Sequence, residues 1–156
     1  MQVILLLGSP ADRAFTDPIV AGLDAFQIPW RLHIASAHKT PRRLLDLLEG
    51  YEAAGEQRVY ITVAGRSNAL SGFVDAQVAA PVIACPPYSE RFGGADLFSS
   101  LRMPSGVAPA VVLEPSAAAL LAAKILGVAD PQLRVRIQQS QEEQRQRLLD
   151  ADAESR

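Results

Sequence analysis

The chain has 156 residues, of which 49% are hydrophobic and 21% charged, and its formal net charge is −2 at pH 7. This length suits one domain with a sizeable core, and the lack of a basic stripe argues against a nucleic-acid partner. One cysteine and two histidines can form neither an internal disulfide nor a Cys/His metal cluster. The apolar runs are too short to cross a bilayer, and Met1–Leu7 carries no secretory signal. We therefore expect a cytoplasmic protein with no membrane partner and no bound metal.

The first expected strand, Val3–Leu7, is a continuous apolar run, which is typical of a strand buried on both faces of a parallel sheet. Ser9 and Asp12 follow it and place a hydroxyl and a carboxylate at the end of the strand. Taken alone, this segment fits a helix cap, with Asp12 as the capping residue, better than a ligand site. The helix that follows is predicted by apolar residues at helical spacing, namely Ile19, Val20, Leu23 and Phe26. Pro18 either begins the regular part of that helix or kinks it.

A second apolar run, Trp30–Ala35, leads into the segment Ser36-Ala37-His38-Lys39-Thr40-Pro41 and then into a helical pattern. Thr40 is a candidate N-cap for that helix. Ligands of open α/β sheets bind outside the carboxyl ends of the strands, so this turn lies where such folds carry chemistry. His38 can take and give a proton near neutral pH, and Lys39 suits an anion. Taken alone, the two residues fit a loop histidine and a solvated charge equally well, while His33, inside the strand, is expected to be structural.

The third expected strand, Val59–Val63, is followed by a polar, glycine-bearing segment, 64–72. Glycine lets a backbone N–H approach a ligand, and Arg66 offers a planar fork for a phosphate or carboxylate. Ser67 and Asn68 can either cap a helix or donate hydrogen bonds to a ligand. A capped turn that carries a solvated arginine explains the segment as well, and the residues alone leave both interpretations open.

The second half of the chain continues the alternation of strands and helices. Short apolar runs predict a fourth strand at 81–85 and a fifth at 110–113, with a helical segment at 96–102 between them. The cysteine of the fourth strand is expected to be a small buried side chain. The helix predicted at 115–126 is apolar nearly all round, so we expect it to be buried, in part against another subunit. A polar C-terminal helix is predicted at about 131–150, fraying near its end.

This alternation predicts a single α/β domain, 1–156, doubly wound in the flavodoxin-like manner. It would have three layers, a central parallel sheet and the C-terminal helix. Because crossovers are right-handed, the ends of the first three strands share one edge of the sheet, and their polar loops should converge there. Hydroxyls, a carboxylate, two cations and an imidazole together suit a small phosphorylated substrate and proton transfer. No GxGxxG or P-loop spacing is present, which argues against a nicotinamide or nucleoside-triphosphate enzyme.

Five motifs follow one another in the chain: Gly8-Ser9-x-x-Asp12, Ser36-Ala37-His38-Lys39-Thr40-Pro41, Ala64-Gly65-Arg66-Ser67-Asn68, Cys85-Pro86-Pro87 and Ser99-Ser100-Leu101-Arg102-Met103-Pro104-Ser105-Gly106. Together they closely resemble the PurE family of purine biosynthesis, over residues 2 to about 127. Class I of that family, the mutase, typically carries His-Leu-Pro-Gly after the third strand. The matching positions here are Ala69-Leu70-Ser71-Gly72, so the histidine is absent. The segment that precedes them is similar to class II, the carboxylase.

The resemblance implies reversible carboxylation of 5-aminoimidazole ribonucleotide (AIR) by carbon dioxide to the 4-carboxylate (CAIR), without ATP, metal or any cofactor. The positions that match the family's ribonucleotide-binding residues are Ser9, Asp12, Lys39 and, in the same loop as Lys39, Ser36. The positions that match the class II segment beside the reacting carbon and carbon dioxide are Gly65, Arg66, Ser67 and Asn68. His38 matches the family's general acid/base. The resemblance also implies a homo-oligomer, a tetramer or an octamer.

Three other functions remain open from the sequence. The first is the mutase, which moves a carboxyl group from the exocyclic nitrogen of N-carboxy-AIR to the ring carbon, and Ala69 argues against it. The second is a non-catalytic nucleotide-binding module of the same fold, because fold does not determine function. The third is a flavodoxin-like interaction domain, which would leave the polar residues at the strand ends unexplained.

Overall fold

The computed structural model describes residues 1–155 and contains a five-stranded, fully parallel sheet in the order β2-β1-β3-β4-β5. The strands are β1 (Gln2–Leu7), β2 (Trp30–Ile34), β3 (Arg58–Val63), β4 (Val82–Ala84) and β5 (Ala110–Val111). This confirms the predicted doubly wound α/β fold. β5 is shorter than predicted because its partner β4 is itself short, and the two prolines that follow Cys85 have no N–H with which to extend the pairing.

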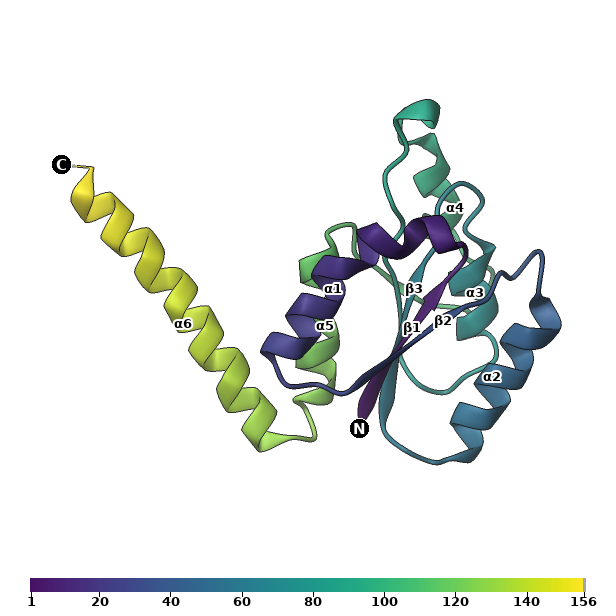
Figure 1. The fold of residues 1–156 in the computed structure, drawn as a ribbon, viewed down its shortest axis with the longest axis horizontal. Helices are drawn as coiled ribbons and strands as arrows, with labels where there is room; N and C mark the ends of the chain where they lie inside the picture. The colour runs from purple at the N-terminus through teal and green to yellow at the C-terminus, as the bar shows by residue number, and fades with distance from the viewer. Residues whose placement is uncertain (156) are drawn as a thin grey trace.

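Helices cover both faces of the sheet and give the three predicted layers (Figure 1). On one face, α1 (Arg13–Ala25) and α5 (Pro115–Leu126) lie side by side. On the other face lie α2 (Pro41–Ala53) and α3 (Ala69–Asp75). A short helix, α4 (Phe98–Leu101), follows two single turns of 3-10 helix, η2 (Glu90–Phe92) and η3 (Ala95–Leu97), in the long connection between β4 and β5.

β1 is an inner strand between β2 and β3, and its side chains alternate between the two cores, as the period of a strand requires. Val3, Leu5 and Leu7 pack with α1 and α5, whereas Ile4 and Leu6 pack on the opposite side; all five are fully buried. The continuous apolar run in the sequence therefore reflects a strand that is covered on both faces.

α1 and α5 approach each other very closely. A Cβ atom built on Gly22 of α1 would lie 2.7 Å from the Cβ of Ala119 on α5, closer than two carbon atoms can pack. Small side chains at this crossing therefore set the distance between the two helices. Pro18 lies inside α1 and not at its start, five residues after the first helical residue, Arg13.

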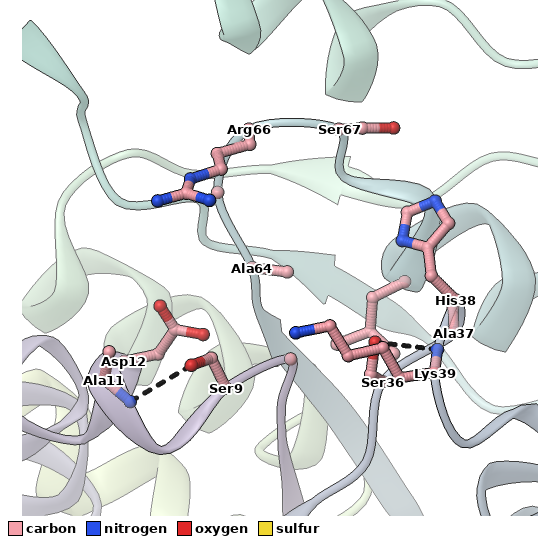
Figure 2. Close-up of a pocket in the computed structure, with 13 residues that line it drawn as sticks. Ser9, Ala11, Asp12, Ser36, Ala37, His38, Lys39, Ala64, Arg66 and Ser67 are labelled. Atoms are coloured by element: carbon pink, nitrogen blue, oxygen red, sulfur yellow. Dashed lines mark hydrogen bonds between the residues drawn. The ribbon is translucent and has the colours of Figure 1, made fainter. Parts of the chain in front are cut away.

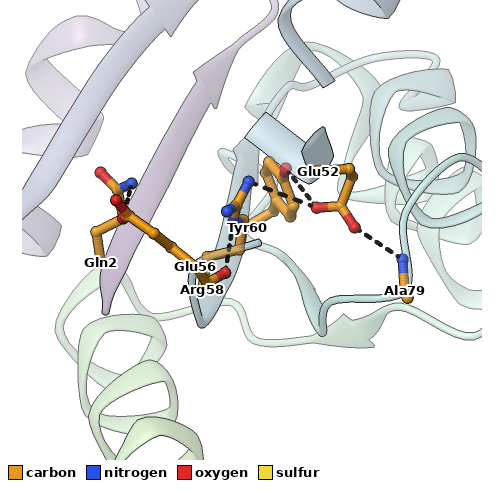
Figure 3. A network of polar contacts seen from close by, with 6 residues as sticks. All are labelled: Gln2, Glu52, Glu56, Arg58, Tyr60 and Ala79. Atoms are coloured by element: carbon orange, nitrogen blue, oxygen red, sulfur yellow. Dashed lines mark hydrogen bonds and ion pairs between the residues drawn. The ribbon is translucent and has the colours of Figure 1, made fainter. Parts of the chain in front are cut away.

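A polar network closes the end of the sheet that lies opposite the site described below (Figure 3). Glu52 of α2 is its centre: one carboxylate oxygen accepts a hydrogen bond from Tyr60 at 3.0 Å, and the other accepts from the backbone N–H of Ala79 at 3.4 Å. The buried guanidinium of Arg58 lies 3.7 Å from the same carboxylate. Burial is the main cause that raises the pKa of Tyr60. The network therefore joins α2 to β3 and to the segment that precedes β4.

The C-terminal helix α6 (Pro131–Glu154) projects away from the sheet (Figure 1). Asp130 caps it by accepting hydrogen bonds from the N–H groups of Gln132 and Leu133. The prediction that the helix ends at about 150 was wrong: side-chain pairs one turn apart, such as Gln146 with Asp150 at 2.7 Å, support the last turns. None of the helices in residues 1–155 has the length and hydropathy of a membrane span.

Candidate active site

The carboxyl ends of β1, β2 and β3 open into one cavity of about 380 Å³ (Figure 2). The three polar loops converge there, as the right-handed crossovers predict. Eight of the nine site residues predicted from the sequence line this cavity: Ser9, Asp12, Ser36, His38, Lys39, Gly65, Arg66 and Ser67. The ninth, Asn68, lies outside it.

The loop after β1 directs a carboxylate into the cavity. Ser9 caps the short 3-10 turn Pro10–Asp12, because its Oγ accepts a hydrogen bond from the N–H of Ala11 at 3.2 Å. Asp12 stands at the expected N-cap position of α1. The carboxylate of Asp12 makes no capping bond and points into the cavity (Figure 2). Burial is the largest effect on its pKa, which is raised, while the backbone at Ser9 and the charge of Arg66 oppose the rise.

A glycine allows the first and third strands to approach each other at the site. A Cβ atom on Gly8 would lie 3.1 Å from the Cβ of Ala64, a tighter contact than side chains normally make. The glycine therefore permits the loop after β1 to lie against the end of β3.

The loop after β2 is closed by its own hydroxyl groups. The Oγ1 of Thr40 accepts a hydrogen bond from the N–H of Ser36 at 2.9 Å, and the Oγ of Ser36 accepts from the N–H of Lys39 at 3.3 Å. Thr40 occupies the predicted N-cap position of α2, but its side chain makes no capping bond because it is used in this loop. Lys39 and His38 are exposed at the tip. The ammonium group points between Ser9 and Ser36, and the imidazole points towards the loop after β3 (Figure 2).

The loop after β3 has an unusual backbone. Arg66 has φ +61°, in the left-handed region that residues with side chains rarely adopt. Its guanidinium extends over the cavity on the side of Asp12 (Figure 2). The Gly65–Ser67 turn thus supplies a planar cation and a hydroxyl to the rim of the cavity.

Asn68 lies beneath this turn and not in the cavity. Its side chain is buried and serves as the N-cap of α3, accepting a hydrogen bond from the N–H of Ser71 at 3.4 Å. Its amide nitrogen donates to the Oγ of Ser100 at 2.9 Å. Of the two roles that the sequence left open for Asn68, the structure therefore assigns the cap.

Two further residues contact the turn and were missed from the sequence. Asp96 and Ser99, in the connection between β4 and β5, accept hydrogen bonds from backbone N–H groups of the turn. Ser99 is the first residue of the motif Ser99–Gly106, but the motif does not indicate what Ser99 does.

The site combines two cations, a carboxylate, several hydroxyl groups and one imidazole. Such a set can hold an anionic ligand and move a proton. Within the described residues no three His, Cys, Asp or Glu side chains are grouped in a way that could hold a metal ion. Cys85 is fully buried, and burial raises the pKa of its thiol to about 12, so it is not an activated nucleophile.

Fold and site together define an α/β protein with a charged and polar cavity at the carboxyl edge of its sheet, of a kind that suits a small anionic ligand. Comparison with known families gives the particular family: the model of the AIR carboxylase family matches residues 2–147. The chain belongs to this family, which confirms the resemblance found in the sequence.

Relatives match over most or all of the chain. A phosphoribosylaminoimidazole carboxylase from Archaeoglobus fulgidus is 51% identical over 156 residues, covering 100% of this chain and 86% of the relative. One from Treponema denticola is 47% identical over 151 residues, covering 97% and 95%. The bifunctional human phosphoribosylaminoimidazole carboxylase/succinocarboxamide synthetase is 40% identical over 129 residues, covering 83% of this chain and 30% of that protein. The crystal structure of Treponema denticola PurE superposes with a TM-score of 0.96 at 46% identity, covering 98% and 97%.

Proposed function

We propose that the protein is a phosphoribosylaminoimidazole carboxylase, which adds carbon dioxide reversibly to the ring carbon of AIR and forms CAIR. One observation carries the proposal: the Gly65–Ser67 turn, which has the class II pattern, lines the same cavity as His38 and Lys39. The relatives from Archaeoglobus fulgidus and Treponema denticola, both named phosphoribosylaminoimidazole carboxylase and similar along nearly the full chain, support it.

The ribonucleotide would be held by the side of the cavity formed by the first two loops. Lys39 suits a phosphate or another anionic group, and Ser9, Ser36 and Asp12 can exchange hydrogen bonds with ligand hydroxyl and amino groups. Binding there would place the aminoimidazole ring near the third loop. The main gain is proximity, since carbon dioxide must be held in line with the reacting carbon.

The carboxylation step needs little activation of the ring. Aminoimidazole is an enamine, so its ring carbon supplies the electron pair for the new bond to carbon dioxide, and the exocyclic nitrogen takes the positive charge. Donors of the Gly65–Ser67 turn and the Arg66 guanidinium can stabilise the carboxylate as it forms. No ATP or other cofactor is needed for this step.

One proton transfer completes the reaction. After carboxylation the ring carbon carries both a hydrogen and the carboxylate, and His38 would remove that proton, returning its bonding pair to the aromatic ring. In reverse the imidazolium gives the proton back to the carbon, and carbon dioxide leaves, which is the carboxy-lyase direction. Ala69, at the first position of α3, offers only a methyl group where the mutases carry a histidine.

A comparison of two substrates tests the proposal. The protein should form CAIR from AIR, bicarbonate and carbonic anhydrase without ATP. N-carboxy-AIR, offered while free carbon dioxide is trapped, should give no efficient turnover. Efficient use of N-carboxy-AIR alone would instead assign the mutase reaction, and turnover of neither would leave a binding module.

We further propose that the chain acts as one domain within a cytoplasmic homo-oligomer, a tetramer or an octamer. The projecting helix α6 supports an oligomer, because only Leu133 and Ile137 of its residues are buried while Leu148 and Leu149 are exposed. Sedimentation equilibrium would test this, and a monomer at micromolar concentration would contradict it.

A further inference from the structure

The Gly65–Asn68 turn is held in shape by residues that lie far from it in sequence. The Oδ2 of Asp96 accepts a hydrogen bond from the N–H of Arg66 at 3.0 Å. The Oγ of Ser99 accepts one from the N–H of Asn68, also at 3.0 Å, and donates to the carbonyl of Arg66 at 3.1 Å or to that of Asp96 at 2.7 Å. We call this pair, Asp96 and Ser99, the clamp.

The clamp acts where the backbone is least favourable. A left-handed backbone at a residue with a side chain persists only when the surroundings over-determine it. The clamp binds the N–H of Arg66, the left-handed residue itself, and the N–H of Asn68, two residues further on. The Asp96 contact is charge-assisted, which makes it stronger than a bond between neutral groups. Without these hydrogen bonds, we expect the backbone of Arg66 to leave the left-handed conformation, φ +61°.

The segment that carries the clamp is itself anchored at both ends. At one end, a Cβ on Gly65 would lie 3.6 Å from the backbone oxygen of Pro87. At the other end, a Cβ on Gly72 of α3 would lie 3.0 Å from the Sδ of Met103. The start and the end of this connection therefore lie close to the turn and to α3.

The clamp uses only backbone groups of the turn. The Arg66 guanidinium and the Ser67 side chain stay free at the cavity, whereas neither Asp96 nor Ser99 lines it. A substrate in the cavity would therefore meet the turn and not the clamp.

We propose that Asp96 and Ser99 are positioning residues for carboxyl recognition, which hold the Gly65–Ser67 turn in the conformation that receives the carboxyl group. The inference rests on the proposed function, since it assigns the turn to the carboxyl side of that reaction. It predicts selectivity: loss of the clamp weakens binding of the carboxylated ribonucleotide and leaves binding of AIR, held by the other two loops, in place.

The test measures both dissociation constants by calorimetry for Asp96→Ala, Asp96→Asn and Ser99→Ala. Asp96→Ala should weaken CAIR binding by at least about tenfold and change AIR binding by less than about twofold. Asp96→Asn keeps an acceptor oxygen and should recover most of the loss. Glu90→Ala, which removes an exposed acid of the same connection that lines no part of the cavity, is the control and should match the wild type.

Two results would overturn the inference: unchanged CAIR binding in both alanine variants, or equal losses for AIR and CAIR. If Asp96→Ala does not fold, Ser99→Ala decides by the same criterion. Amide hydrogen exchange in the ligand-free protein provides a second measurement, with faster exchange at Arg66 in Asp96→Ala than in the wild type. If the wild type forms CAIR but amide exchange at Arg66 is unchanged in Asp96→Ala, the clamp is wrong and the proposed function stands. If the wild type forms no CAIR, the proposed function itself is wrong.

Discussion

The carboxylate of Asp12 and the guanidinium of Arg66 face each other across the cavity, from loops that follow different strands (Figure 2). The charge of Arg66 lowers the pKa of Asp12, but the desolvation of the carboxyl group outweighs it and the net pKa is raised. In the ligand-free protein, the ionised carboxylate of Asp12 therefore lowers the stability of the fold.

This relationship predicts a gain in stability when the charge is removed. Because the folded pKa of Asp12 is above its value of 3.8 in an unfolded chain, folding loses stability as pH rises through the folded pKa. Asp12→Asn should therefore raise Tm at pH 7 by up to about 2 °C, and the gain should vanish below about pH 3. Melting curves across this pH range check it, and a lower Tm of the variant at pH 7 would contradict the assignment.

Lys39 should matter for binding and not for folding, because its side chain is exposed and points into the cavity (Figure 2). Loss of one charge-assisted contact, about 1.5–3 kcal/mol, should raise the Kd for AIR about 10- to 150-fold in Lys39→Ala. Arg42→Ala is a matched control, because Arg42 is an exposed cation at the start of the adjacent helix and pairs with Asp46. Calorimetric titration that gave equal losses for both variants would place the anion elsewhere.

His38 should carry the proton. His38→Asn keeps a polar side chain but cannot shuttle a proton at neutral pH, so we expect kcat to fall by about 10²–10⁴-fold. The residue is exposed at a loop tip, so Tm and the Kd for AIR should stay close to those of the wild type. Steady-state rates in both directions check this, and a rate close to wild type would show that another group moves the proton.

His33 should control stability in a defined pH range. Its Nε2 and the Tyr51 hydroxyl share a hydrogen bond at 2.7 Å, and burial, aided by Arg43 and Arg31, lowers its pKa below 6.5. The neutral ring is favoured in the folded protein, so stability is complete above pH 6.5 and falls as pH drops towards the folded pKa.

His33→Asn should therefore cost about 1–2 kcal/mol at pH 7.5, and the difference from the wild type should narrow below pH 6.5. Denaturant unfolding at several pH values measures both effects. Tyr51→Phe removes the hydrogen bond but keeps the titrating ring, so it should retain the pH dependence. A constant difference between His33→Asn and the wild type across this range would rule out titration of His33.

The crossing of α1 and α5 predicts a destabilising alanine. Gly22→Ala would place a methyl group 2.7 Å from that of Ala119, and overpacking of this kind costs about 1–3 kcal/mol, or about 3–10 °C in Tm. Ala119→Gly in the same chain removes the clash and should recover part of the loss. A single variant that is more stable than the wild type would show that the helices can move apart.

The helices and strands were predictable because their signals are local. α5 begins at Pro115 and ends at Leu126, as predicted, because a mostly apolar segment between a proline and a glycine specifies both ends. β1 was predictable for the same reason. The convergence of the three loops followed from the handedness of the crossovers, so most of the residues that line the cavity could be predicted from the sequence.

Other parts of the site were not predictable because they depend on tertiary contacts. Asn68 carries the same chemistry as a cap or as a ligand, and only its contact with Ser100 distinguishes the two roles. Asp96 is the first residue of the segment predicted to be helical, and its hydrogen-bond partner is a backbone N–H of a distant loop, so no residue type in the sequence indicates the contact. A short 3-10 turn, Pro10–Asp12, was not predicted; Ser9 caps this turn, and Asp12, at the N-cap position of α1, makes no capping bond.

The position of β1 between two strands that follow it in the chain has a consequence for the order of folding during synthesis. β1 precedes both of its neighbours in the chain, and β3, which pairs with it along its whole length, is complete only when Val63 has been made. Until then the edge of this apolar strand that receives β3 stays unpaired on the nascent chain, in a form prone to associate with other chains. β1, whose residues Val3–Leu7 are fully buried in the folded protein, is thus the strand that most needs protection from aggregation during translation.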